Sequence, residues 1–350
     1  MNNNKKILIT GGNGFVGHHV IEAILKDTNW NIINLDKMSY AAEGFDRIKD
    51  IQAYDSERVL NLACDLTLPL SDGVKKEIGT IDYIINLASE SHVDNSISDP
   101  VPFVKNNVNL VISMLEYARE LKENGKGIER FIQFSTDEVY GTAPIGIDYK
   151  EGDRYNPGNP YSASKAMQEC LCYAYSNTYG IPIQITNTMN VLGERQHPEK
   201  YLPLCITNIL SGKKLMIHSN PERTKAGTRF YIHARNVADA LIYIIKNSTE
   251  FLDNIDSSKG KFHIVGEREL DNLELALMVQ SSVNKVKGYE TKVLNYELVD
   301  FHSSRPGHDL RYGMSGTKMD NLGWTLPHAI EKSIDNIVEW TLREENKRWL

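Results

Sequence analysis

Long apolar runs and paired cysteines are both absent from this sequence of 350 residues. No run approaches the roughly 20 apolar residues that a membrane-spanning helix needs, and the polar start of the chain lacks the apolar region of a signal peptide. The four cysteines (Cys64, Cys170, Cys172 and Cys205) form no CxxC pair. These absences argue against a membrane protein, a disulfide framework and a metal site, so we expect inert thiols in the cytoplasm.

An excess of positive charge is lacking as well. The 39 Lys and Arg residues are outnumbered by 46 Asp and Glu residues, which gives a formal net charge of −7. Binding a polyanion requires a basic surface, so we expect no nucleic-acid partner. The composition, 41% hydrophobic and 24% charged, is typical of a soluble globular protein, and the length allows one large α/β domain or two unequal ones.

Short apolar segments and amphipathic segments alternate through the first half of the chain. The apolar segments predict strands at residues 6–10, 30–35, 58–63, 83–87, 130–135 and 183–187. Helical spacing predicts helices at 14–26, 102–123 and 162–179. Strands separated by helices form βαβ units, so we predict an α/β fold with a Rossmann-type, doubly wound parallel sheet. Ligands of such sheets bind beyond the carboxyl ends of the strands.

The regular pattern loosens after residue 187, where polar stretches at 194–200 and 220–228 separate shorter elements. We therefore predict a Rossmann cofactor domain over 1–187 and a smaller C-terminal substrate-binding α/β domain over 188–350. Segments near 230–265 are expected to return to the first domain. Trp324 is expected to pack within the smaller domain, and the charged residues 344–348 to form a solvated helix end.

Three glycines after the first predicted strand point to a dinucleotide. Gly11, Gly14 and Gly17 follow strand 6–10 and open helix 14–26, whose free N–H groups favour a phosphate. Their GxxGxxG spacing differs from the common GxGxxG, and a glycine-rich turn without a ligand is the alternative interpretation. Asp36 closes the next strand, where an acid binds a ribose hydroxyl and repels the 2′-phosphate of NADP. The pattern favours NAD, although the adjacent Lys37 weakens this repulsion.

Tyr161 and Lys165 are four residues apart and therefore lie on one face of a helix. Lowering the pKa of a tyrosine from about 10 to near 7 requires about 4 kcal/mol, which a nearby ammonium and an adjacent nicotinamide cation can supply together. An isolated YxxxK is commonly a surface pair. Here it follows a set of predicted nucleotide-binding strands, which favours a catalytic role.

Thr136, Asp137 and Glu138 directly follow strand 130–135 and are therefore expected at the ligand edge of the sheet. Two adjacent carboxylates at such a position can also belong to an exposed turn. The hydroxyl of Thr136 favours a functional interpretation, because enzymes that use a Tyr–Lys pair place a hydroxyl beside the tyrosine.

Five further segments carry a family resemblance. They are residues 35–41 (LDKMSYA), 87–94 (LASESHVD), 135–141 (STDEVYG), 197–200 (HPEK) and 305–309 (RPGHD). Together with the glycine motif and YxxxK, these segments follow one another in the family's order from about residue 7 to 324. The chain therefore resembles the extended short-chain dehydrogenase/reductases. Within them it is similar to the nucleotide-sugar 4,6-dehydratases, most closely the dTDP-glucose 4,6-dehydratases. Epimerases and decarboxylases of the superfamily generally lack the Asp–Glu pair.

The resemblance implies an NAD-dependent lyase of deoxysugar biosynthesis that converts a nucleoside-diphosphate hexose to a 4-keto-6-deoxy sugar. Tyr161, supported by Thr136 and Lys165, takes the proton of the 4-hydroxyl while hydride passes from C4 to NAD⁺. Glu138 then removes the C5 proton, Asp137 protonates the departing 6-hydroxyl, and the hydride returns to C6. Opposite duties require separated pKa values, so we expect Asp137 to be held protonated.

The resemblance also implies two sets of binding residues. The cofactor set is Gly11, Asn13, Gly14, Phe15, Val16, Gly17, Asp36, Lys37, Asp65, Leu66, Leu87, Ala88, Ser89, Ser91, Asn106, Tyr161, Lys165 and Val191. Asp65 is expected near the adenine, although an aspartate that closes a strand is also a common turn former. The substrate set is Ser91, His92, Thr136, Asn190, Lys200, Tyr201, Ile217, His218, Arg229, Arg305 and His308. Helices 103–123 and 162–179 are implied to pair across a homodimer.

The family pattern breaks where the nucleotide base should bind. The chain has Met216-Ile217-His218 and a long stretch, 219–228, before Arg229, and His263 stands where the family has asparagine. We favour dTDP-glucose or UDP-glucose as substrate, and a GDP- or CDP-linked hexose or heptose stays open. The alternatives are an epimerase or 5,6-dehydratase on the same fold, or a non-catalytic NAD-binding protein, which the complete catalytic set disfavours.

Overall fold

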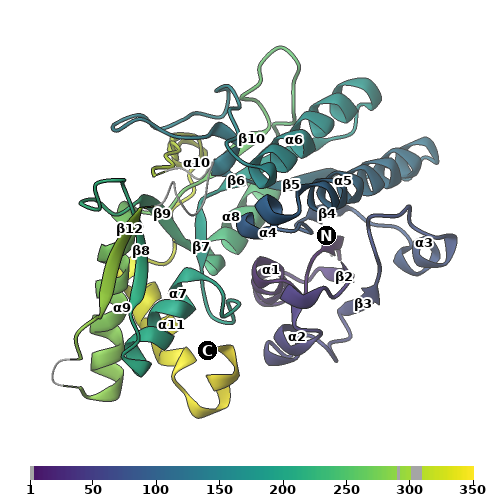
Figure 1. Ribbon diagram of the computed structural model, residues 1–350. Helices are drawn as coiled ribbons and strands as arrows, with labels where there is room; N and C mark the ends of the chain where they lie inside the picture. The colour runs from purple at the N-terminus through teal and green to yellow at the C-terminus, as the bar shows by residue number, and fades with distance from the viewer. Residues whose placement is uncertain (1–3, 290–291, 301–309) are drawn as a thin grey trace.

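A seven-stranded sheet forms the centre of the protein, with the strand order β10-β6-β5-β4-β1-β2-β3 (Figure 1). The computed structural model describes residues 4–289, 292–300 and 310–350. All neighbouring strands of this sheet are parallel. They are β1 (Lys6–Thr10), β2 (Asn31–Asp36), β3 (Val59–Ala63), β4 (Tyr83–Asn86), β5 (Arg130–Thr136), β6 (Ile183–Thr188) and β10 (Lys261–Ile264). The predicted Rossmann-type α/β fold is confirmed.

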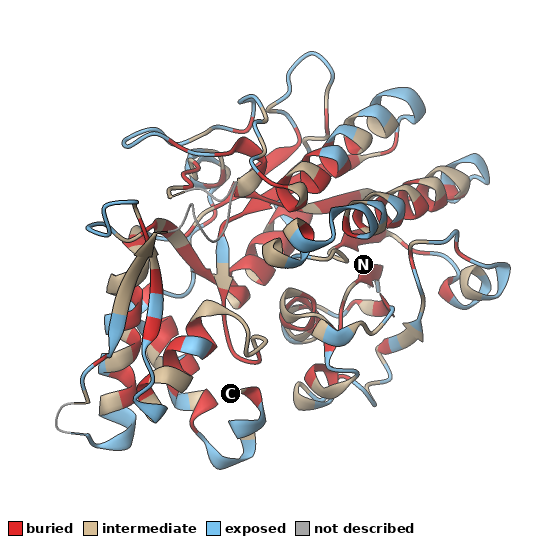
Figure 2. Cartoon of the chain, in the orientation of Figure 1, coloured by how far each residue is buried: buried red, intermediate tan, exposed pale blue. Residues whose placement is uncertain are grey.

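Alternate residues of the central strands face two separate hydrophobic cores. Ile7 and Ile9 of β1 pack into one core, and Leu8 between them packs into the other; all three are fully buried. Figure 2 shows most of the central sheet in the colour of buried residues. A strand that is covered on both faces has apolar side chains on both of them, so its sequence is a continuous apolar run. This is why the strands predicted from the sequence agree with the observed ones to within one residue at each end.

Helices cover both faces of the sheet. The first core includes residues of α1 (Phe15–Asp27), α2 (Asp46–Asp50), α8 (Ala234–Asn247) and α10 (Thr317–Leu322). The second includes residues of α3 (Asp72–Ile78), α5 (Pro100–Glu123) and α6 (Pro160–Tyr179). The short helix α4 (Val93–Ser98) packs against α5 and α6. Two 3₁₀ turns, η1 (Tyr40–Ala42) and η2 (Asp137–Tyr140), follow β2 and β5.

A smaller group of elements lies beside the main sheet (Figure 1) and has its own core, the third core. It contains a three-stranded sheet, β11-β9-β7, and a parallel pair, β12 and β8. Helices α7, α9 and α11 pack on these strands. The bounds are β7 (Asn190–Leu192), α7 (Tyr201–Ser211), β8 (Leu215–Ser219), β9 (Thr228–His233), β11 (Glu269–Asp271), α9 (Asn272–Lys287), β12 (Tyr296–Asp300), α11 (Ile330–Thr341) and η3 (Glu344–Trp349).

Several late segments belong to the main body. β10 pairs with β6 in the central sheet, and α8 packs against α1. The expectation that Trp324 packs within the smaller domain is wrong, because its ring lies in the first core and its Nε1 donates to Asp239 Oδ1 of α8 at 2.7 Å. The charged side chains of η3 are largely exposed, as expected, but Trp349 at its end is buried.

The four cysteines are all free, as predicted. Within the described ranges, no helix is both long enough and apolar enough to cross a membrane.

Candidate active site

The glycine loop between β1 and α1 brings two backbone segments close together. Gly11 has φ +72°, and a Cβ at this position would lie 2.9 Å from the Ala88 backbone. A Cβ on Gly17 would lie 2.1 Å from the carbonyl oxygen of Gly11. Gly14 precedes α1 without a side-chain cap, so the first N–H groups of the helix are available to an anion. The loop therefore requires glycine and presents donors to a diphosphate.

Asp36 closes β2 beside this loop and is 8% exposed. Its carboxylate accepts hydrogen bonds from the backbone N–H groups of Asn13, at 3.0 Å, and Met38, at 2.7 Å. Burial raises the pKa of Asp36. Since a carboxylate has about four acceptor positions, two remain for ribose hydroxyls. Lys37 donates to Asn106 Oδ1 at 2.6 Å, so these two residues of the predicted cofactor set are in contact.

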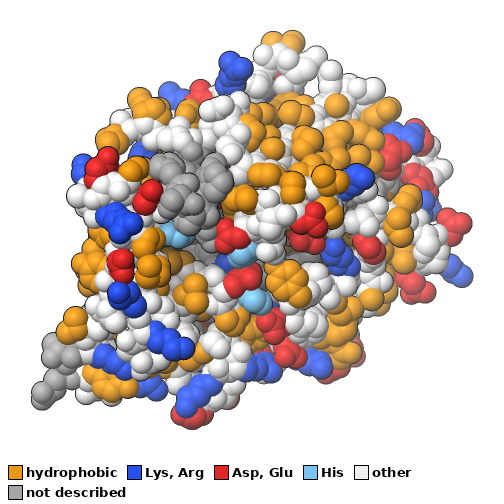
Figure 3. Space-filling view, in the orientation of Figure 1, with side chains coloured by type: hydrophobic (Ala, Val, Ile, Leu, Met, Phe, Trp, Pro, Cys, Tyr) orange, Lys and Arg blue, Asp and Glu red, His pale blue; other side chains and the backbone are white. Residues whose placement is uncertain are grey.

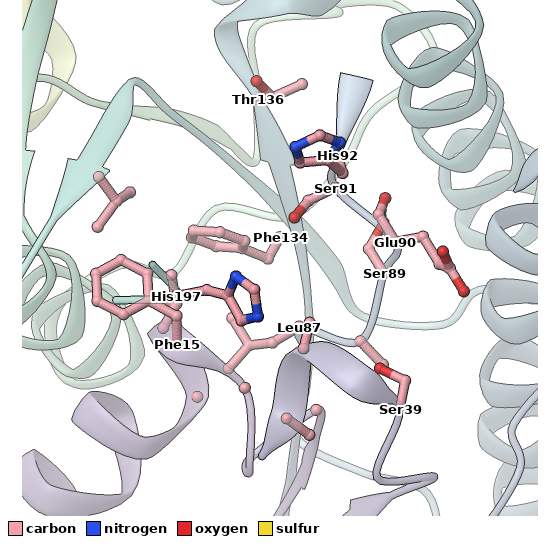
Figure 4. A pocket seen from close by; sticks show the side chains of 18 of the residues that line it. Phe15, Ser39, Leu87, Ser89, Glu90, Ser91, His92, Phe134, Thr136 and His197 are labelled. Carbon is pink, nitrogen blue, oxygen red and sulfur yellow. The ribbon is translucent and has the colours of Figure 1, made fainter. Parts of the chain in front are cut away.

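One large pocket collects most of the predicted residues. Figure 4 shows Ser91, His92 and Thr136 near one another in this pocket. Asn13 is the one cofactor-set residue that is not on the wall, and it lies behind Asp36. The predicted residues that line the pocket are Gly11, Gly14, Phe15, Val16, Gly17, Asp36, Lys37, Asp65, Leu66, Leu87, Ala88, Ser89, Ser91, His92, Asn106, Thr136, Asp137, Glu138, Tyr161, Lys165, Asn190, Val191 and Lys200.

Asp65 forms a turn, which is one of the two interpretations that its position allowed. Its Oδ1 accepts the backbone N–H and the hydroxyl of Thr67 at 2.9 and 2.8 Å, which is the geometry of a turn former. The backbone hydrogen bond from Thr67 lowers the pKa of Asp65. The residue also lines the pocket beside Leu66.

Thr136 joins the end of β5 to η2 and fixes the first carboxyl group of the site. Its hydroxyl donates to Asp137 Oδ1 at 2.9 Å and accepts from the backbone N–H of Glu138 at 3.3 Å. Asp137 is 4% exposed, and its Oδ2 has no hydrogen-bond partner among the described residues. Burial, followed by the charge of Glu138, raises the pKa of Asp137 to about 7. This carboxyl group is therefore suited to carry a proton near neutrality.

Glu138 is next to Asp137 in sequence but has different partners. The side-chain amide of Asn159 donates to Glu138 Oε2 at 3.2 Å, and the hydroxyl of Tyr312 donates to the same oxygen at 3.3 Å. Hydrogen bonds donated to a carboxylate favour its ionised form. Asn159 also caps α6 through Ser162, so the helix that carries Tyr161 is tied to Glu138.

Tyr161 and Lys165 lie one turn apart on α6, both buried. Lys165 Nζ donates to the carbonyl oxygen of Phe134 at 2.7 Å, and burial lowers the pKa of Lys165 to about 8. Burial, with the charges of Glu138 and Asp137, raises the pKa of Tyr161, whereas a hydrogen bond with Thr136 lowers it. The protein groups alone therefore do not lower the pKa of Tyr161, and the predicted lowering requires the adjacent nicotinamide cation as well.

The substrate set is divided among three locations. Ser91, His92, Thr136, Asn190 and Lys200 line the pocket. Arg229 on β9 is buried beside it, donates to the carbonyl oxygens of Thr228 and Leu310, and stacks on the ring of Tyr312 at 4.5 Å. Arg305 and His308 lie outside the described residues.

Three other members of the substrate set lie away from the pocket wall. Ile217 is fully buried in the third core, and this corrects its predicted contact with substrate. The cause is the alternation of β8, which turns Leu215 and Ile217 inward and leaves Met216 48% exposed. Tyr201 packs against the same core and donates to the carbonyl oxygen of Asn272 at 2.6 Å, and His218 is half-buried on β8.

His263 does not belong to a nucleotide-base pocket. It is fully buried on β10, and its Nε2 lies 2.8 Å from the hydroxyl of Tyr140. The expectation that this departure from the family alters the base site is therefore wrong, because the residue packs within the main sheet.

The pocket also contains residues that the sequence did not reveal. They include Arg47, Phe134, His197 and Glu199. His197 and Glu199 stand inside the segment HPEK, which could have pointed to them. No local pattern singles out Arg47, which lies on a short helix between two strands.

The residues of this pocket fit a dinucleotide. The uncapped start of α1 and the close approach at Gly11 suit a diphosphate, and Asp36 retains acceptors for a ribose. Among the described side chains, no group of three His, Cys, Asp or Glu residues is placed to hold a metal ion.

Fold and site together define a class of protein. A family model described as GDP-mannose 4,6 dehydratase matches residues 8–337. The chain therefore belongs to this family of nucleotide-sugar dehydratases within the extended short-chain dehydrogenase/reductases, which confirms the resemblance seen in the motifs.

Individual relatives cover nearly the whole chain. The sequence is 34% identical over 366 residues to dTDP-glucose 4,6-dehydratase of Escherichia coli, covering 98% of this chain and 95% of that protein. The crystal structure of dTDP-glucose 4,6-dehydratase from Bacillus anthracis in complex with NAD is similar, with a TM-score of 0.78, 28% identity and coverage of 99% and 98%. The corresponding protein from Streptomyces venezuelae, also with NAD, gives a TM-score of 0.80, 29% identity and coverage of 98% of each chain.

The fold alone does not distinguish activities within this group. UDP-glucuronic acid 4-epimerase from Bacillus cereus has a TM-score of 0.78 at 22% identity, and the match covers 96% of this chain and 99% of that one. The assignment of a reaction must therefore come from the side chains of the site.

Proposed function

We propose that this protein is an NAD-dependent lyase, a nucleotide-sugar 4,6-dehydratase that forms a 4-keto-6-deoxy sugar from a nucleoside-diphosphate hexose. The observation that carries the proposal is the pair Asp137 and Glu138 beside Tyr161, with two different environments. Elimination of water needs an acid and a base in addition to the group that serves the 4-hydroxyl. The relatives named dTDP-glucose 4,6-dehydratase support the same reaction.

Each catalytic residue has a defined task in this proposal. Tyr161, with Thr136 and Lys165 beside it, takes the proton of the sugar 4-hydroxyl. The ketone at C4 makes the C5 hydrogen acidic, so Glu138 removes it while Asp137 gives its proton to the 6-hydroxyl, which leaves as water. NAD held by the cofactor set would supply the hydride chemistry, by accepting a hydride from C4 and returning it to C6, and Glu138 gives its proton back to C5 as the hydride returns.

The two binding sets follow the two domains in most of their residues, but Val191 of the cofactor set lies after residue 187, and Ser91, His92 and Thr136 of the substrate set lie before it. We assign the dinucleotide to the predicted cofactor set on residues 1–187, supported by α8 and β10. We assign the nucleoside diphosphate to the side of residues 188–350, where Lys200, His218, Arg229, Arg305 and His308 provide polar groups. An arginine fork suits a diphosphate, and Arg229 is already held by two carbonyl oxygens near the pocket.

The sugar nucleotide that we favour is dTDP-glucose or UDP-glucose. The departures on β8 and in the stretch 219–228 affect the side expected to hold the base, so a GDP- or CDP-linked hexose or heptose is the alternative substrate. Incubation of the purified protein and NAD⁺ with a panel of these compounds, followed by mass spectrometry, tests the choice. The substrate is the one that loses a molecule of water.

A product assay with two variants tests the reaction itself. The 4-keto product gives a chromophore in alkali, whereas a 4-epimerase product gives none. We expect Asp137→Asn and Glu138→Gln to abolish most of this chromophore while NAD stays bound. Release of NAD from either variant would mark the pair as structural, and an epimerised product from the wild type would favour the epimerase.

We also propose a homodimer formed through α5 and α6. These helices pack against each other, and their outer face carries exposed apolar side chains such as Val101, 60% exposed, and Met167, 39% exposed. Figure 3 shows apolar side chains gathered over these two helices. The free cysteines suit the cytoplasm, which we propose as the location.

A further inference from the structure

The last residues of the chain fold back onto the cofactor side of the molecule. The turn η3 follows α11 of the third core, but Trp349 at its end is only 3% exposed and contacts α2. Its Nε1 donates to Asp50 Oδ2 at 3.2 Å, and the guanidinium of Arg348 pairs with the same carboxylate. The end of the smaller group of elements is thus attached to the main body.

Trp349 covers a fully buried cation. The guanidinium carbon of Arg47, on α2, lies 5.0 Å from the centroid of the Trp349 ring, within the range of a cation–π contact. Burial lowers the pKa of Arg47 to about 10. Arg47 forms no ion pair within the described part of the chain, so the aromatic face takes the place of solvent over this charge.

Arg47 in turn holds the backbone around the dinucleotide pocket. Its Nη1 donates to the carbonyl oxygens of Asn13 at 3.3 Å and Ala41 at 2.7 Å. Asn13 belongs to the glycine loop and donates its own N–H to Asp36. Arg47, Ala41 and Asp36 all line the pocket. One buried guanidinium therefore connects the glycine loop with the turn after β2.

A second contact of the same type supports the attachment. The guanidinium of Arg195 lies 4.6 Å from the ring of Trp340 on α11, and its Nε donates to Asp50 Oδ2 at 3.3 Å. Arg47 Nε donates to the carbonyl oxygen of Arg195 at 2.9 Å. Asp50 of α2 thus accepts hydrogen bonds from Arg195, in the segment after β7, and from Arg348 and Trp349 of η3.

We propose that Arg47 is a positioning residue for the dinucleotide and that the C-terminal segment, through Trp349, holds Arg47 in place. The segment that closes the chain then contributes to retention of the cofactor although it does not touch the cofactor itself. The inference depends on NAD binding at the glycine loop, which belongs to the proposed function, but not on the dehydration chemistry.

Titration of the cofactor-free protein with NAD⁺ by calorimetry tests this inference. For Trp349→Ala we expect the dissociation constant to rise about tenfold, because the buried cation loses its aromatic cover. Trp349→Phe keeps a ring over Arg47 and should raise the constant less than about threefold. Glu345→Ala changes an exposed residue of the same turn and serves as the matched control, with no change expected.

Thermal unfolding of each cofactor-free variant shows whether it is folded. If Trp349→Ala does not fold, Arg47→Met tests the same step, since it keeps an apolar stem under Trp349 and removes the donors to Asn13 and Ala41. Unchanged affinity in a folded Trp349→Ala or Arg47→Met protein would overturn the inference. Failure of the wild type to bind NAD⁺ would instead overturn the proposed function.

Discussion

Asp137 and Glu138 are adjacent residues whose surroundings separate their acid–base behaviour. Asp137 is buried, has a single hydrogen bond from Thr136, and leaves Oδ2 without a partner among the described residues. Glu138 accepts from Asn159 and Tyr312. The first environment favours the neutral acid and the second favours the carboxylate, which matches the assignment of donor and base.

The pKa of about 7 at Asp137 predicts a pH dependence of two quantities. As pH rises through about 7, Asp137 loses the proton that the elimination requires, so kcat should fall on the alkaline side. Because the folded-state pKa is raised above the unfolded value, stability is fully present below about 4 and is lost as pH rises toward 7. Asp137→Asn should remove this loss of stability. The loss is a few kcal/mol, because the pKa is raised by about three units.

Measurements at two pH values check both parts. The wild type and Asp137→Asn are compared by urea unfolding at pH 5 and pH 8, and the wild-type kcat is followed over the same range. An equal response of both proteins to pH would show that Asp137 is ionised in the folded state, contrary to its assignment as the acid.

The two donors to Glu138 predict a second effect at the scale of the residue. Asn159→Ala or Tyr312→Phe should lower kcat about tenfold with little change in KM, because a hydrogen bond to a charged group contributes about 1.5–3 kcal/mol. Tyr149→Phe is a matched control, since that hydroxyl donates to the carbonyl oxygen of Thr142 instead. An increase in KM alone would place Asn159 and Tyr312 in substrate binding.

Residues in continuous motifs could be predicted from the sequence, whereas their supports could not. Gly11, Asp36 and Tyr161 stand at fixed distances from strand ends, so their place at the sheet edge follows from the pattern. Tyr312 and Arg47 reach the site from segments that have no motif, and only the folded chain brings them there.

At the scale of the element, most of the correctly predicted strands are buried on both faces, whereas a residue of a strand with one exposed face was misread. The central strands have apolar side chains on both sides, so their limits were apparent. β8 alternates between buried Ile217 and exposed Met216, and family position alone assigned Ile217 to the substrate. Period-two burial is the physical signal that corrects this assignment.

The first strand–helix junction gives a prediction that belongs to this scale. Gly17→Ala should abolish NAD binding or folding, because its Cβ would lie 2.1 Å from the Gly11 carbonyl oxygen. Gly73→Ala is the control, since a Cβ there would meet no atom closer than 3.9 Å. Calorimetric titration with NAD⁺ and thermal unfolding measure both variants. Normal affinity in Gly17→Ala would show that the loop can move apart without loss of the cofactor.

At the scale of the whole molecule, segments distant in sequence pack against one another around the main sheet. β10 and α8 return to the main body, and η3 reaches α2 from the other side. A boundary at residue 187 describes the order of patterns along the chain, and the return of segments near 230–265 across it was expected, but the other contacts across it could not be foreseen. They depend on single residues such as Trp349 and Trp324, whose environment is set only when the two groups of elements meet.

The exposed apolar face of α5 and α6 gives the last prediction. Met167→Glu places a charge on this face, so the proposed dimer should dissociate at micromolar concentration because a buried unpaired charge is costly. Leu204→Glu on α7 is a matched control, since Leu204 and Met167 are each 39% exposed. Light scattering after gel filtration should give twice the chain mass of 39.6 kDa for the wild type and Leu204→Glu, and a single chain mass for Met167→Glu. A dimer that survives Met167→Glu but not Leu204→Glu would place the interface on the smaller group of elements. A monomeric wild type would contradict the proposed dimer.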